Sequence, residues 1–366
     1  MNPLVELHAY GQSFWYDNIR RKFLQGGTLK GLIEDDGLRG MTSNPAIFEK
    51  AINGSDDYDV EMKALVDAGT TDPMTIYETL AFADIKAACD LFADLYAESN
   101  GGDGFVSLEV SPYLARDTEG TVEEARRLVT AVNRPNLMIK VPATPEGIPA
   151  IRELIAAGIN VNITLMFSMA HYEAVAEAYI QGLKQLLANG GDPQKVASVA
   201  SFFVSRVDAA VDKKLTELND SAAEALMGKV AIANSKVVYQ RFKDLFHGKD
   251  FAELQSAGAA RQRLLWASTS TKNPSYPDTL YIDELIGPET VNTIPPATVN
   301  AFRDHGKIAN TLESNTEEAQ VTLDNLAELQ INLDEITEKL QNDGVDAFAK
   351  SFDTLMGAIE TKLDQL

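Results

Sequence analysis

This chain is poor in the residues that build disulfides, histidine metal sites and surfaces for polyanions. Its one cysteine, Cys89, excludes an internal disulfide, and the helical pattern around it predicts a packed thiol. Its four histidines lack the spacing of metal ligands, so we expect no metal site built on histidine. Lys and Arg number 32 against 54 Asp and Glu, and this net charge of −22 argues against nucleic acid or an anionic membrane as a partner.

Long hydrophobic runs are also missing. No stretch of about 18 apolar residues could cross a membrane, and the N-terminus lacks the basic start and apolar core of a secretory signal. We therefore expect a cytoplasmic protein. With 366 residues, 45% of them hydrophobic, the chain is long enough for one large domain or two ordinary ones. The sequence leaves both a monomer and a homodimer open.

Short apolar runs alternate with longer segments of helical pattern, which is typical of a parallel sheet with crossover helices. Eight such runs without a convincing ninth favour an α/β fold of the (β/α)8 barrel type, a TIM barrel, over an open doubly wound sheet. The predicted strands are Ser13–Tyr16, Gly37–Thr42, Phe105–Val110, Leu137–Pro142, Asn160–Met166, Val196–Val204, Leu264–Ser268 and Thr290–Thr293.

We expect a single barrel domain over residues 1–366, decorated by helices. An insertion at about 53–98 contains helical patterns over 56–67 and 73–97, and a helical extension at about 309–366 follows the eighth strand. Thr121 with Glu124 predicts a capping box for a helix over 125–132, and Ser168 predicts the cap of a helix over 169–187.

Lys140 is the most informative residue, because it lies between Ile139 and Val141 in a predicted buried strand. Burial disfavours the charged ammonium form, and a free amine can attack a carbonyl to form a Schiff base. The alternatives are that Lys140 lies on an edge strand, or that its aliphatic stem is buried while its amine reaches solvent.

Other polar residues lie at the ends of the predicted strands, where barrel enzymes place their active sites. Several of them have a structural alternative: Asp17 as a helix cap, Asn44 before Pro45 as a turn former, and Arg206 as a partner of Asp208. Together they favour a site, because buried polar groups need partners. The candidates are Asp17, Asn44, Glu109, Lys140, Asn162, Thr164, Ser201, Phe203, Arg206, Ser268 and Lys272.

At these positions the chain resembles transaldolase. The segment 42–46, Thr-Ser-Asn-Pro-Ala, resembles the first signature of that family, and 139–144, Ile-Lys-Val-Pro-Ala-Thr, resembles the second, which carries the Schiff-base lysine. The segments 162–168, 201–206 and 266–268 also fit. The resemblance implies a (β/α)8 barrel without a cofactor that moves a dihydroxyacetone unit between sugar phosphates in the non-oxidative pentose phosphate pathway.

The resemblance also implies roles for the candidates. Lys140 would form the imine with fructose 6-phosphate or sedoheptulose 7-phosphate, and Asp17 would take the proton of the C4 hydroxyl. Glu109 and Thr164, with a water molecule, would shuttle protons as the imine forms and hydrolyses. The binding residues would be Asn44, Asn162 and Ser201 for the hydroxyls, Phe203 as an apolar wall, and Arg206 and Ser268 for the phosphate.

The sequence departs from the family pattern in three places. Ser111 stands where family members commonly carry an acidic residue, and Ser270 stands where many shorter members have a second phosphate-binding arginine. Lys272 is the nearest cation, and we expect it to replace that arginine, without the bidentate fork of a guanidinium. The first signature is preceded by Arg-Gly-Met at 39–41, not by an acidic residue.

Two rival functions remain open at this point. One is a Schiff-base aldolase of the fructose 6-phosphate type, which releases free dihydroxyacetone, although such enzymes are much shorter. The other is a barrel that binds sugar phosphates without turnover. A buried amine beside carboxylates has no use in a binding module, which favours the enzyme.

Overall fold

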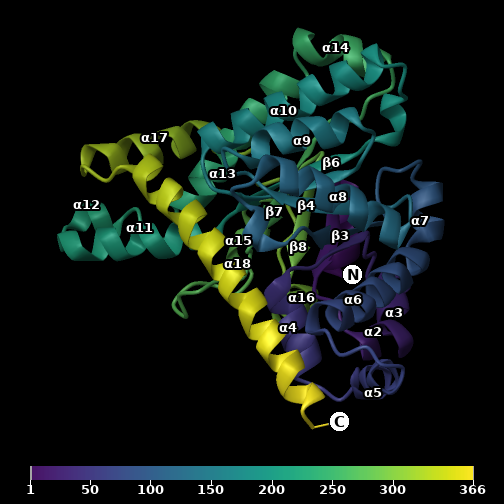
Figure 1. The fold of residues 1–366 in the computed structure, drawn as a ribbon. Helices are drawn as coiled ribbons and strands as arrows, with labels where there is room; N and C mark the ends of the chain where they lie inside the picture. The colour runs from purple at the N-terminus through teal and green to yellow at the C-terminus, as the bar shows by residue number, and fades with distance from the viewer. Residues whose placement is uncertain (1, 366) are drawn as a thin grey trace.

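Eight parallel strands close into a barrel in the order β1 to β8 in the computed structural model, which describes residues 2–365 (Figure 1). The predicted (β/α)8 barrel is therefore confirmed. The strands are β1 Gln12–Asp17, β2 Gly40–Thr42, β3 Phe105–Glu109, β4 Leu137–Pro142, β5 Val161–Met166, β6 Ser198–Phe203, β7 Arg263–Ala267 and β8 Thr290–Ile294.

Helices surround the barrel and bury the outer faces of the strands, which is why β4, β5 and β6 are buried at every position. No helix in the described part of the chain is both long enough and apolar enough to span a bilayer. The helices, including three short 3-10 helices (η), are α1 Pro3–Glu6, η1 Leu7–Tyr10, α2 Arg21–Gln25, α3 Thr28–Asp35, α4 Pro45–Asn53, α5 Asp59–Asp67, α6 Pro73–Leu91, α7 Ala93–Glu98, η2 Pro112–Leu114, α8 Thr118–Val132, α9 Gly147–Ala156, α10 Met169–Ala188, η3 Pro193–Lys195, α11 Ser205–Leu218, α12 Ser221–Glu224, α13 Val230–Phe246, α14 Lys249–Ser256, α15 Leu280–Asp283, α16 Pro296–His305, α17 Thr316–Glu328 and α18 Leu333–Leu363.

Some local predictions need correction. The capping box at Thr121 was wrong, because α8 begins at Thr118 and the side chain of Asp117 accepts from Gly120 N. Ser168 does cap α10, accepting from His171 N at 3.1 Å. The helix predicted over 73–97 is divided at Phe92 into α6 and α7. Strand β2 is shorter than predicted, because Gly37 adopts a left-handed conformation with φ of 68°.

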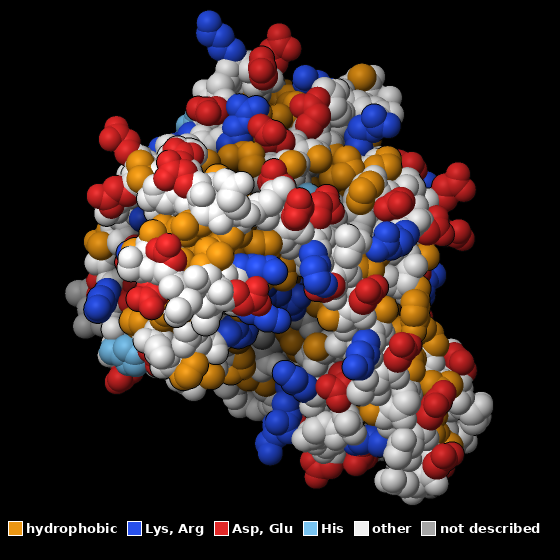
Figure 2. All heavy atoms as spheres, turned by 90° about the vertical axis from the view of Figure 1, so that its left-hand side faces the viewer, with side chains coloured by type: hydrophobic (Ala, Val, Ile, Leu, Met, Phe, Trp, Pro, Cys, Tyr) orange, Lys and Arg blue, Asp and Glu red, His pale blue; other side chains and the backbone are white. Residues whose placement is uncertain are grey.

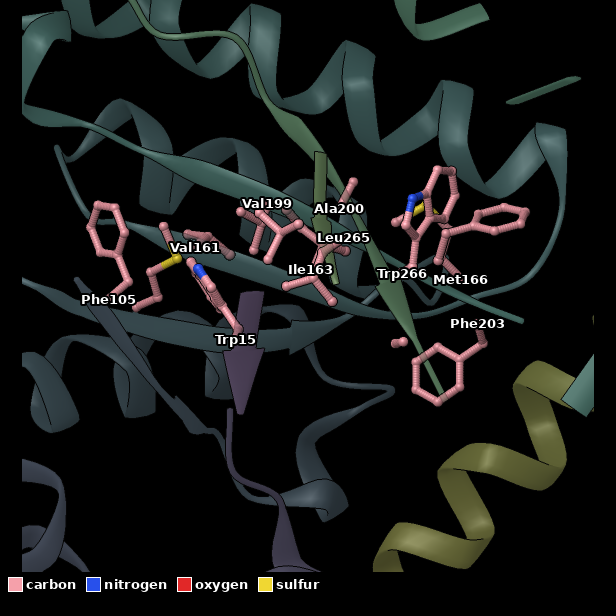
Figure 3. Packing of buried hydrophobic residues seen from close by; sticks show 14 of the residues in the cluster. Trp15, Phe105, Val161, Ile163, Met166, Val199, Ala200, Phe203, Leu265 and Trp266 are labelled. Atoms are coloured by element: carbon pink, nitrogen blue, oxygen red, sulfur yellow. The ribbon is translucent and has the colours of Figure 1, made fainter. Parts of the chain in front are cut away.

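Aromatic side chains lie toward both ends of the buried cluster, with aliphatic side chains such as Ile163 and Leu265 between them (Figure 3). Trp15 and Phe105 lie near one end, with ring centroids 6.3 Å apart, and Phe203 lies near the other end (Figure 3). Position 40 has to be glycine, because a Cβ atom there would lie 2.5 Å from the Trp15 indole. At the amino-terminal end of the barrel, Asp103 pairs with Arg39 at 2.6 Å and Arg263 at 3.0 Å.

The long helix α18 crosses the molecule on the side of the barrel from which the predicted site opens (Figure 1). It packs against α4, α11 and β5, which lie far from it in the sequence. Gln341 donates two hydrogen bonds to the barrel, and Lys362 Nζ donates to Ser55 O at 2.6 Å. These bonds hold α18 to the barrel near its start and to the loop after α4 at its end.

Candidate functional site

Lys140 lies in the barrel interior at the carboxyl-terminal half of β4, with 5% of its surface exposed. Strand β4 pairs with both β3 and β5, so the residue is not on an edge strand. Its Nζ lies 3.3 Å from Glu109 Oε2 and 3.3 Å from the carbonyl oxygen of Ser43. The register aligns Glu109, Lys140 and Asn162 across three neighbouring strands, as the sequence predicted.

Two buried carboxyl groups accompany this amine. Burial raises the pKa of Glu109, and the positive charge of Lys140 opposes that rise. Burial likewise raises the pKa of Asp17, against the opposing effects of Lys140 and a hydrogen bond from Thr42 Oγ1 at 2.7 Å. Asp17 does not cap a helix, because α2 begins at Arg21 after an N-cap at Arg20. Both groups are placed to exchange protons with a ligand at Lys140.

Neutral polar groups continue the site across β5 and β6. Ser201 Oγ donates to Asn162 Oδ1 at 2.7 Å, and Asn162 Nδ2 donates to Ser107 Oγ at 3.0 Å. Thr164 is fully buried, and its Oγ1 has no hydrogen-bond partner within residues 2–365. A buried hydroxyl without a partner is expensive in a folded protein, so Thr164 is a group that a ligand or water can satisfy.

A cavity of about 420 Å³ opens above Lys140. All of the predicted site residues line it except Glu109 and Asn162, which contact lining residues from behind. Asn44 is a helix cap and not only a turn former, because its Oδ1 accepts from Ile47 N at the start of α4, and the residue also lines the cavity. The predicted set, drawn from seven strand ends, therefore gathers in one place.

One side of this cavity is cationic. Arg206 lies over the Phe203 ring at 5.1 Å, and its predicted alternative partner Asp208 instead accepts from Ala231 N and Tyr281 Oη. Burial lowers the pKa of Arg206, and Asp17 opposes this effect.

Lysines complete this cationic side. Lys272 Nζ donates to Ser270 Oγ at 2.8 Å, and Lys50 of α4 also lines the cavity. Burial lowers the pKa of Lys272, and the charges of Arg206 and Lys50 add to this effect. Figure 2 shows blue Lys and Arg side chains around a hollow in this part of the surface. A ligand with a negative group therefore finds a local positive field in a strongly acidic protein.

Ser268 follows β7 in a left-handed conformation, with φ of 55°. Its Oγ hydrogen-bonds to Ser205 Oγ at 2.9 Å, and its carbonyl oxygen accepts from Ser205 N. A non-glycine residue held in this region is strained, and such strain is common at binding sites. The bonds to Ser205 hold the Ser268 hydroxyl beside the start of α11 and Arg206.

The surroundings of the site also bear on metal binding, and they include a second cavity. Within residues 2–365, no group of three His, Cys, Asp or Glu side chains is placed to hold a metal ion. A second cavity of about 260 Å³ lies on the other side of Glu109, between α6, α8 and α18. The thiol of Cys89 is buried in α6, as predicted, and lines neither cavity.

Comparison with known proteins decides the family. A family model described as transaldolase/fructose-6-phosphate aldolase matches residues 14–359. The chain belongs to the transaldolase/fructose-6-phosphate aldolase family. It is 48% identical to a transaldolase of Trichodesmium erythraeum over 375 residues, covering 100% of this chain and 98% of the relative. A transaldolase 2 of Nostoc punctiforme is also 48% identical with the same coverage, and a transaldolase of Thiobacillus denitrificans is 45% identical, covering 98% and 100%.

Membership of this family agrees with the resemblance carried by the two signature segments. Sequence reasoning nevertheless missed cavity residues that lie away from strand ends. Lys50 is on the second turn of α4, and Phe348 is in the middle of α18, about 200 residues after Lys140. A lysine on a helix and an aromatic residue in an amphipathic pattern carry no local signal of function. Thr42 and Thr293, at the ends of β2 and β8, also line the cavity with their Oγ1 atoms 2.6 Å apart beside Asp17, although neither was in the candidate set.

Proposed function

We propose that this protein is a transaldolase of the non-oxidative pentose phosphate pathway. It would convert sedoheptulose 7-phosphate and glyceraldehyde 3-phosphate to erythrose 4-phosphate and fructose 6-phosphate. The observation that carries the proposal is the buried amine of Lys140 beside Glu109, in a cavity that also holds Asp17 and three cations. Relatives named transaldolase that align over the full length of the chain support it.

The first half of the reaction forms the Schiff base. The Lys140 amine adds to the ketose carbonyl carbon C2 after giving up a proton, and the resulting carbinolamine loses water to give an iminium ion. Glu109, 3.3 Å from the amine, takes up and returns protons in these steps, with Thr164 as a hydroxyl partner for the water. The raised pKa of Glu109 suits this exchange, because burial makes this carboxyl easier to protonate than an exposed glutamate.

The second half of the reaction cleaves the bond between C3 and C4 and transfers the three-carbon unit. Asp17 takes the C4 hydroxyl proton, the bond between C3 and C4 breaks, and its electron pair moves to the iminium to give an enamine. The aldose phosphate leaves, and the enamine carbon C3 attacks the aldehyde of the acceptor. Hydrogen bonds from Asn44, Asn162 and Ser201 hold the hydroxyls of the three-carbon unit between these events, and Phe203 forms an apolar wall.

The cationic side of the cavity binds the phosphate. Arg206 and Ser268 contact it, and Lys272 takes the place of the arginine that Ser270 replaces. Lys50 adds a third positive charge from α4. Charge-assisted hydrogen bonds of this kind are about twice as strong as neutral ones, which offsets repulsion by the net charge of −22. We also propose that residues 1–366 act as one domain, in the cytoplasm, as a monomer or homodimer.

Reductive trapping tests the proposal. Incubation with fructose 6-phosphate and borohydride should fix a three-carbon or six-carbon adduct on the peptide that contains Lys140, detected by mass spectrometry. The Lys140→Met variant serves as the control and should show no adduct and no activity. An adduct on another lysine, or none at all, would refute the mechanism. Steady release of free dihydroxyacetone without an acceptor would instead favour the aldolase.

A further inference from the structure

Phe348 brings the C-terminal helix into the active-site cavity. The residue is 6% exposed and lines the same cavity as Lys140 and Phe203. The Lys140 amine lies 5.6 Å from the centroid of the Phe348 ring, over its face. Phe203 comes from β6 and lies at the end of the barrel near α18 in Figure 3. Two aromatic rings from distant parts of the chain therefore border the position where the imine would form.

The position of Phe348 is set by the strands that carry the catalytic groups. Gln341, two turns earlier on α18 and 3% exposed, donates from Nε2 to Ala143 O at 2.9 Å and Leu165 O at 3.0 Å. Leu165 adopts a φ of 58° where the pairing of β5 with β6 shifts register, which turns its carbonyl out of the ladder. A Cβ atom at position 344 would lie 2.8 Å from Leu165 Cδ2, so the glycine lets α18 approach this side chain closely.

The chemistry of the intermediate gives this ring a purpose. A phenyl ring offers no donor, acceptor or bound water, so it keeps solvent from the face of the imine nitrogen that it covers. The enamine can be lost in one way besides transfer. A proton adds to C3, water adds to C2 of the resulting iminium, and the C2 to nitrogen bond breaks to release free dihydroxyacetone and the Lys140 amine. Access of water decides between the two routes.

We propose that Phe348 determines the specificity for transfer, by excluding water from the Lys140 enamine until the acceptor aldose binds. This inference rests on the proposed Schiff-base function of Lys140. It assigns to α18, a helix outside the barrel, a part in the partition between transferase and aldolase activity.

The test compares two phenylalanines on one helix. Phe352, one turn after Phe348 and 4% exposed, packs against Tyr77 and Tyr113 and does not line the cavity of Lys140. Each would be changed to alanine and to leucine. Two rates are measured with fructose 6-phosphate: dihydroxyacetone release without acceptor, by coupled oxidation of NADH, and transfer to erythrose 4-phosphate.

In Phe348→Ala the ratio of release to transfer should rise about tenfold or more, with Phe348→Leu between it and the parent. The ratio should stay at the parent value in Phe352→Ala, even though that variant loses comparable core packing. An unchanged ratio in Phe348→Ala, or equal losses of both rates, would overturn the proposal. Borohydride adducts on Lys140 are measured in the same samples. Their absence from the parent protein would reject the Schiff-base function itself, whereas adducts with an unchanged ratio would reject only the role of Phe348.

Discussion

Asp208 offers a quantitative test of the electrostatics next to the site. It lies on α11 two residues after Arg206 and is 1% exposed. Its Oδ1 accepts from Ala231 N at 2.7 Å and its Oδ2 from Tyr281 Oη at 2.9 Å. These bonds favour the carboxylate, but burial is the larger effect and raises the pKa of Asp208 from 3.8 to about 7.

The sign of the resulting pH dependence follows from linkage. Between pH 4 and pH 7 the folded protein holds a proton on Asp208 that the unfolded chain has released, so the free energy of unfolding falls as pH rises through this window. A shift from 3.8 to about 7, at about 1.4 kcal/mol per pKa unit, corresponds to a loss on the order of 4 kcal/mol.

The perturbation is Asp208→Asn, which removes the titration and can keep both contacts, since its oxygen accepts from Ala231 N and its amide donates to the Tyr281 hydroxyl. Urea unfolding followed by circular dichroism between pH 4 and pH 8 gives the free energy of unfolding for parent and variant. From the low to the high end of this range, the free energy of unfolding of Asp208→Asn should rise by roughly 4 kcal/mol relative to that of the parent.

The variant Asp208→Ala serves as the control. It loses both acceptors and should be less stable than Asp208→Asn at every pH, by about 1 to 3 kcal/mol, yet show the same pH slope. If the parent and Asp208→Asn follow parallel profiles, burial does not raise the pKa of this carboxyl, and the reasoning fails.

Two further changes test the site and its support. Asp17→Ala should still give the borohydride adduct on Lys140 while turnover falls about 10² to 10⁴-fold, because only the C4 proton acceptor is lost; loss of the adduct would show that Asp17 has another role. Gln341→Leu leaves the carbonyl oxygens of Ala143 and Leu165 without their donor and should lower the free energy of unfolding by about 1 to 3 kcal/mol per carbonyl. If urea unfolding gives this variant the same free energy of unfolding as the parent, these bonds do not hold α18 in place.

The local pattern of the chain was enough to predict the barrel and most of the candidate site. Strands buried on both faces read as short apolar runs, and a charged residue such as Lys140 within one is conspicuous. The predictions that failed concern the boundaries of helices and of β2, and at the start of α8 two capping residues compete. Asp117 and Thr121 are both good caps, and the contact of the Thr121 hydroxyl with Leu114 O leaves the capping role to Asp117.

The roles of Asp17 and Arg206 could not be separated from their structural alternatives in the sequence, because the partners that distinguish them come from elsewhere. The hydroxyl that donates to Asp17 belongs to Thr42 on the next strand, and the ring beneath Arg206 belongs to Phe203. Their side chains converge only because the barrel closes.

By itself, the sequence determined the strand count, the buried lysine and the set of polar strand ends, since each is a property of a few neighbouring residues. The tertiary structure alone decided that Phe348 lies over Lys140 and that Lys50 joins the cationic side of the cavity. Both residues lie on helices, and the local sequence pattern there does not distinguish a packed or exposed side chain from a functional one. Their contribution depends on where those helices dock, which is set by long-range packing and by buried hydrogen bonds such as those of Gln341.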